Sequence, residues 1–123
     1  MLYNKFMNIG LIPSRLKSKR LNKKPLLVID GLPMVVHTFK RALLSKLLDR
    51  VIVCTDHKSI LDVVKRHGGE AMLTSAKHKN GTERIHEVSK KFGKNDLIID
   101  IQGDQPLVDP KSIDETIKFQ KKN

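Results

Sequence analysis

Residues 50–69 have the sequence RVIVCTDHKSILDVVKRHGG and contain a complete strand–helix unit. The apolar run within 50–55 is short and uninterrupted, a pattern typical of a strand buried on both faces of a parallel sheet. After it, Ile60, Val63 and Val64 share one face of a helix. The unit therefore favours an α/β fold, in which helices pack on the faces of a parallel sheet.

The alternation of strand and helix extends to both sides of this unit. Short apolar runs predict further strands at 8–12, 70–74 and 96–101. Helical spacing and an Asp-Pro start predict one helix that carries Val36, Phe39 and Leu43 and another that runs from Asp109-Pro110 toward Gln120. This order calls for a mostly parallel sheet with helices on both faces. No linker or repeat divides the sequence, so we expect one domain over residues 1–123.

Polar residues and glycines mark the expected helix ends. Asp56 or Ser59 should cap the helix of the central unit. Asn80 precedes Glu83 by three residues, which is the spacing of a capping box, so another helix should begin directly after Asn80. We expect that helix to end at Gly93.

Composition narrows the classes of protein. With 39% hydrophobic residues the chain is not intrinsically disordered, and without a long apolar run or a secretory signal we expect a cytoplasmic protein with no membrane partner. The net charge of +11 points toward a polyanionic partner, but 4% aromatic residues leave few platforms for stacking bases and disfavour nucleic acid. Cys54 is interpreted as a core residue, and the five histidines lack metal-binding spacing.

In a parallel sheet, ligands bind beyond the carboxyl ends of the strands. The loop after the first strand brings Arg15, Arg20 and Lys24 to that edge, and these cations suit a polyphosphate. Asp104 follows the most apolar strand, where a carboxylate can reach a bound cation. Alone, the basic loop is typical of a solvated surface and Asp104 of a turn. Together they predict a nucleotide bound with Mg²⁺.

Three segments in order carry a family resemblance: IPSRLKSKRLNKKPL at 12–26, NGTERI at 80–85 and DIQGDQPLVDP at 100–110. They resemble the 3-deoxy-manno-octulosonate cytidylyltransferases, and the match covers nearly the whole chain. The resemblance implies a nucleotide-diphospho-sugar transferase-like, Rossmann-like fold. It also implies a nucleotidyltransferase that joins CTP to 3-deoxy-D-manno-octulosonate, giving CMP-KDO and pyrophosphate for lipopolysaccharide biosynthesis.

Residue roles follow from the same resemblance. It assigns to the nucleotide Pro13, Ser14, Arg15, Arg20, Lys24, Asn80, Gly81 and Thr82. Arg15 and Lys24 would act in catalysis together with Asp104, which would bind Mg²⁺ as the cofactor, and Gln102 would face the sugar acid.

The sequence also departs from the family pattern. Asn22-Lys23 stand where the family has Pro-Gly, which alters the geometry expected of the basic loop. Asn80 replaces a serine and Gln105 a glutamate, and both changes keep hydrogen-bonding capacity.

Family enzymes continue well past the last predicted helix and carry there a second metal carboxylate and most sugar-acid contacts. We therefore expect this chain to be incomplete relative to the family and to associate as a homodimer or with a complementing chain that covers apolar surface. Two alternatives stay open: a non-catalytic or split CTP-binding half of such an enzyme, and a sialic-acid-type cytidylyltransferase.

Overall fold

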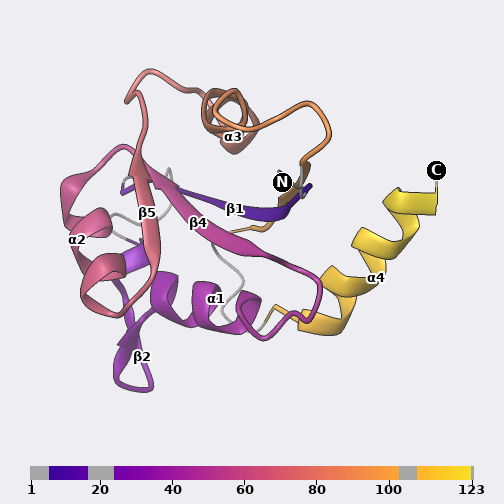
Figure 1. The fold of residues 1–123 in the computed structure, drawn as a ribbon. Helices are drawn as coiled ribbons and strands as arrows, with labels where there is room; N and C mark the ends of the chain where they lie inside the picture. The colour runs from indigo at the N-terminus through magenta and orange to yellow at the C-terminus, as the bar shows by residue number, and fades with distance from the viewer. Residues whose placement is uncertain (1–5, 17–23, 103–107, 123) are drawn as a thin grey trace, which may run out of the picture.

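Parallel strands form the centre of the molecule. The computed structural model describes residues 6–16, 24–102 and 108–122. Within these residues four parallel strands form one sheet in the order β5-β4-β1-β6, which confirms the predicted α/β class (Figure 1). The strands are β1 (Asn8–Ser14), β4 (Arg50–Thr55), β5 (Glu70–Leu73) and β6 (Leu97–Asp100).

The strand register aligns the carboxyl ends. Ser14 at the end of β1 pairs with Thr55 at the end of β4, and Thr55 pairs with Leu73 at the end of β5. On the other side of β1, Leu11 pairs with Asp100. The segments that follow these strands therefore leave the sheet along one edge.

Helices cover both faces of the sheet. α3 (Gly81–Ser89) packs on one face, and α1 (Met34–Ala42), α2 (Lys58–Arg66) and α4 (Pro110–Lys122) pack on the other. Figure 1 shows α3 above the sheet and α1 below it. Alternate residues of each strand enter opposite cores: Ile9 and Ile52 contribute to the α3 side, Ile12 and Val53 to the other. All four side chains have no exposed surface.

A small hairpin connects the basic loop to α1. The short helix η1 (Lys24–Leu26) leads into β2 (Val28–Ile29) and β3 (Leu32–Pro33), which pair antiparallel. Asp30 and Gly31 make the turn with φ of 49° and 83°, the left-handed values that a two-residue hairpin turn requires. The His37 ring on α1 donates from Nε2 to the carbonyl of Ile29, so the hairpin is fixed to the helix.

Several predicted boundaries are wrong by a few residues. α1 ends at Ala42, and Leu43 is exposed instead of lying on the apolar face, because the chain turns toward Ser45. α3 ends at Ser89, before Gly93, whose N–H instead donates to Asp96 Oδ2 at 2.8 Å in the next turn. The predicted strands at 70–74 and 96–101 are each slightly shorter.

The cap of α2 also differs from the prediction. His57 is the N-cap, and its Nδ1 accepts from the Ser59 N–H at 3.1 Å. The Asp56 carboxylate lies instead 3.9 Å from Arg84 on α3. The cap of α3 is confirmed, because Asn80 Oδ1 accepts from the Glu83 N–H at 2.9 Å.

Asp114 fixes α4 against the turn that follows α1. Its carboxylate accepts from Ser45 Oγ at 2.5 Å, Leu47 N at 3.1 Å and Lys46 N at 3.2 Å. The Ser45 hydroxyl, followed by these two N–H groups, lowers the pKa of Asp114 below its ordinary range.

Because the pKa of Asp114 is lowered in the folded chain, its stabilising effect is present at neutral pH and is lost as the pH falls through and below the ordinary aspartate range. We expect Asp114→Asn to lower the free energy of unfolding by about 1 kcal/mol at neutral pH and by progressively less in acid. Urea unfolding followed by circular dichroism across this range measures the difference. Asp62→Asn, at an exposed site on α2, is the control. The difference between its free energy of unfolding and that of the wild type should not change as the pH falls.

Candidate functional site

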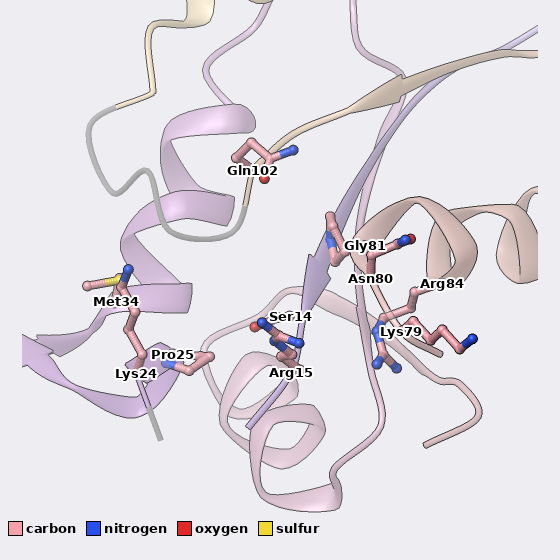
Figure 2. Close-up of a pocket in the computed structure, with 11 residues that line it drawn as sticks. Ser14, Arg15, Lys24, Pro25, Met34, Lys79, Asn80, Gly81, Arg84 and Gln102 are labelled. Carbon is pink, nitrogen blue, oxygen red and sulfur yellow. The ribbon is translucent and has the colours of Figure 1, made fainter. Parts of the chain in front are cut away.

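A cavity of about 280 Å³ lies at the carboxyl edge of the sheet. Its walls come from the end of β1, from η1 and the start of α1, from the start of α3 and from the segment after β6 (Figure 2). The lining residues are Pro13, Ser14, Arg15, Lys24, Pro25, Met34, Lys79, Asn80, Gly81, Arg84 and Gln102. Segments far apart in the sequence thus meet at the edge of the sheet where the register of the parallel strands predicts.

The cavity is electropositive. Figure 2 shows Lys24 on one side, Lys79 and Arg84 on the other, and Arg15 between them. The described lining residues include four cationic side chains and no carboxylate. Such a wall favours an anionic ligand that carries several charges.

A buried hydroxyl at this cavity has no partner within the described chain. Ser14 is 4% exposed, and its Oγ makes no hydrogen bond with the described residues. Leaving a buried hydroxyl unpaired costs free energy, so such groups are normally satisfied. Since Ser14 lines the cavity, a bound ligand with a polar group can supply the partner.

The cavity wall at the start of α3 depends on a glycine and a cap. A Cβ at Gly81 would lie 3.0 Å from Pro13 Cγ, so only glycine allows these two lining residues to approach without displacement. The Asn80 amide is engaged as the cap of α3. Glu83 Oε1 accepts from the N–H of Lys79, the residue before the cap, at 2.8 Å.

Arg84 was not predicted as a site residue, yet it is the most deeply buried cation of the cavity. It is 3% exposed and donates from one terminal nitrogen to Thr74 Oγ1 and, at 3.2 Å, to the Ser75 carbonyl. A signal exists in the sequence, because Arg84 precedes the buried Val88 by four residues and so shares the core-facing side of α3.

A second cavity of about 470 Å³ adjoins the first, beyond the ends of β4 and β5. It is lined by Arg15, Leu16, Asp56, His57, Ala76, His78 and Arg84. Arg15 and Arg84 line both cavities, so these two side chains stand between them.

The structure brings most predicted site residues together. Pro13, Ser14, Arg15, Lys24, Asn80, Gly81 and Gln102 all line the first cavity. Thr82 is exposed in the first turn of α3 and is not a lining residue. Arg20 and Asp104 lie outside the described residues.

Gln102 lies close to a carboxylate of the sheet. Its Nε2 is 3.5 Å from both oxygens of Asp100, and partial burial raises the pKa of Asp100 above its ordinary value. Within the described residues no group of three or more His, Cys, Asp or Glu side chains is arranged to hold a metal ion.

Two further features bear on chemistry. Burial raises the pKa of Cys54 to about 12, so its thiol stays protonated and serves as a core residue. In the described part of the chain, no helix combines the length and apolar character needed to span a membrane.

A family model described as cytidylyltransferase matches residues 9–123. The chain belongs to the cytidylyltransferase family. Among individual members of the family, it is 51% identical to the 3-deoxy-manno-octulosonate cytidylyltransferase of Yersinia pseudotuberculosis serotype O:1b (strain IP 31758), over 83% of this chain and 41% of that relative. It is 44% identical to the protein of the same name from Saccharophagus degradans, over 87% and 42%.

Solved cytidylyltransferases share the fold. CMP:2-keto-3-deoxy-manno-octonic acid synthetase complexed with CTP is similar with a TM-score of 0.91 and 35% identity, over 95% of this chain and 48% of that chain. A cytidylyltransferase from Leptospira borgpetersenii serovar Hardjo-bovis gives 0.76 and 27%, over 92% and 48%. The chain described in this structure therefore spans less than half the length of each of these relatives.

The burial of Arg84 predicts a large effect of its removal. Arg84→Met leaves Thr74 Oγ1 without its donor and the Asp56 carboxylate without its cation, and we expect a loss of about 2–3 kcal/mol in the free energy of unfolding. Arg50→Met is the control, since it also removes one positive charge. Arg50 pairs with Glu70 at a partly exposed site, where loss of the pair should cost less than about 1 kcal/mol. Equal losses in urea unfolding would contradict the assigned role of Arg84.

Proposed function

We propose that the chain is the CTP-binding part of a 3-deoxy-manno-octulosonate cytidylyltransferase. In this function CMP is transferred from CTP to 3-deoxy-D-manno-octulosonate, and pyrophosphate is released. The observation that carries the proposal is the cationic cavity at the carboxyl edge, with the unpartnered Ser14 hydroxyl in its wall. The likeness to a synthetase complexed with CTP supports the choice of nucleotide.

The triphosphate is proposed to occupy the side of the cavity formed by η1 and α1. Lys24 and Arg15 supply charge there, and Arg20 belongs to the same proposal although it lies outside the described residues. The start of α1 adds to this side, because Pro33 provides no side-chain cap and the first turn contains no acidic residue. The N–H groups at such a helix end favour phosphate oxygens.

The cytidine is proposed to lie on the opposite side. Pro13, Ser14 and Gly81 would border it, with the Ser14 hydroxyl as the hydrogen-bonding group. Because the Asn80 side chain caps α3, its contribution is proposed to be the placement of the loop and of Gly81. Thr82 retains its proposed contact on the basis of the family resemblance alone.

The sugar acid is proposed to approach from the side of Gln102. Mg²⁺ is proposed at Asp104, where it would neutralise phosphate charge. Asp104 lies outside the described residues, and the described residues form no metal group, so no step is assigned to the ion.

The proposed reaction is an in-line displacement at phosphorus. The anomeric hydroxyl of the sugar acid attacks the α-phosphorus of CTP and loses its proton, a new P–O bond forms, and the bond to the pyrophosphate oxygen breaks. Arg15 and Lys24 offset the negative charge that grows on the departing pyrophosphate. No covalent intermediate with the protein is needed.

Calorimetric titration with CTP in the presence of Mg²⁺ tests the proposal. We expect Arg15→Ala and Lys24→Ala each to weaken CTP binding by roughly tenfold or more, because each removes a charge-assisted contact to phosphate. Lys90→Ala removes the same charge from an exposed residue after α3 and should leave the affinity unchanged. Failure of the wild-type chain to bind CTP, or equal affinities for all variants, would contradict the proposed site.

Pyrophosphate release with CTP, Mg²⁺ and 3-deoxy-D-manno-octulosonate separates the alternatives. Turnover supports a complete catalytic site within these residues. CTP binding without turnover supports the second candidate, a non-catalytic or split CTP-binding half of such an enzyme. Faster turnover with a sialic acid would support the sialic-acid-type enzyme instead. A homodimer or a complementing chain stays a prediction, which sedimentation velocity can test.

A further inference from the structure

The segment before α3 is held by side chains of that one helix. Glu87 Oε1 accepts from the Ser75 N–H at 3.0 Å, and Glu83 Oε1 accepts from the Lys79 N–H at 2.8 Å. Arg84 donates to the Ser75 carbonyl at 3.2 Å. We call these contacts of Glu83, Arg84 and Glu87 with residues 74–79 the α3 tether.

His78 adds a side-chain contact to the tether. Its Nε2 lies 2.7 Å from Glu87 Oε1, the same oxygen that accepts from Ser75. An ionised carboxylate only accepts, so Nε2 carries a proton and donates. The second ring nitrogen, Nδ1, lies 3.9 Å from Glu83 Oε1, so the ring stands between two carboxylates of α3. The Ser75 N–H and the His78 ring both hold the pKa of Glu87 below its ordinary range.

This position connects His78 to the nucleotide cavity through the backbone. His78 is among the residues that line the second cavity, whereas the next three residues, Lys79, Asn80 and Gly81, line the first. His78 is not among the lining residues of the proposed nucleotide cavity. Loss of the His78–Glu87 contact would remove one of the contacts that hold the loop carrying those three residues.

We propose that His78 is a positioning residue that sets the affinity of the cavity for CTP by fixing residues 75–81 to Glu87. The inference rests on the proposed function. It assigns to His78 no contact with nucleotide, sugar or reacting atoms. If the loop is already ordered before the nucleotide binds, binding loses less conformational entropy. Without the His78–Glu87 contact, more of the loop would have to become ordered during binding.

Four variants and a control test the role of His78. We expect His78→Ala to weaken CTP binding by roughly five- to tenfold, the effect of one typical net hydrogen bond. His78→Gln retains an N–H donor and should recover most of the affinity. His86→Ala removes an exposed histidine from α3 and should bind as the wild type does. Adding His78→Ala to Glu87→Ala should cause no further loss, because the partner is already absent.

Amide hydrogen exchange without nucleotide provides a readout that does not depend on CTP. The Ser75 and Lys79 amides should exchange faster in His78→Ala than in the wild type, while amides of β4 should not change. Unchanged exchange at both amides would overturn the proposal, as would a wild-type CTP affinity in His78→Ala. Additive losses of CTP affinity from Glu87→Ala and His78→Ala in the double variant would overturn it too. Failure of the wild-type chain to bind CTP would contradict the proposed function itself. Equal CTP affinities of a binding wild type and His78→Ala would instead contradict only the role of His78.

Discussion

The parallel pairing of β1 with its two neighbours is the constraint on which the site depends. It places Ser14 beside Thr55 at one level of the sheet and sends the segments after β1, β4, β5 and β6 to the same edge. A shift of the register by one residue would exchange the two faces of a strand and send Ile9 and Ile12 to the wrong cores. The buried apolar residues thus determine where the polar cavity forms.

α3 connects this core to the cavity. Its apolar side, with Ile85 and Val88, packs on the sheet, and its polar side chains hold the segment before it. Arg84 belongs to both regions, since it is buried yet lines the two cavities. Because one helix has both roles, the stability of the sheet and the shape of the nucleotide wall are coupled through it.

The elements that depend on local patterns were predictable from the sequence. The buried strand over Arg50–Thr55 and the Asn80 cap of α3 follow from short-range rules, and both are found. The errors arise where tertiary contacts override those rules. Asp56 does not cap α2, because its carboxylate lies near Arg84 from a distant segment. Gly93 does not end α3, because its N–H is used in the turn with Asp96.

The candidate site was predictable to a similar extent. Arg15 and Lys24 could be proposed from the basic loop after the first strand and Gln102 from the family resemblance, and all three line one cavity. The spacing places Arg84 on the core-facing side of α3, but its role at the cavity was not predicted, and neither was the His78–Glu87 contact, because both depend on the packing of α3 against a loop. Side-chain hydrogen bonds to backbone groups of this kind become visible only in three dimensions.

Backbone amide chemical shifts, recorded while the chain is titrated with CTP and Mg²⁺, test directly whether CTP binds in the cavity at the carboxyl edge of the sheet. We predict saturable shifts concentrated at Ser14, Lys24, Gly81 and Gln102, with little change along the lysine-rich exposed sides of the helices. Shifts spread over those exposed lysines, without saturation and without a focus on the cavity, would show that the positive charge of the chain attracts CTP non-specifically and would contradict the proposed site.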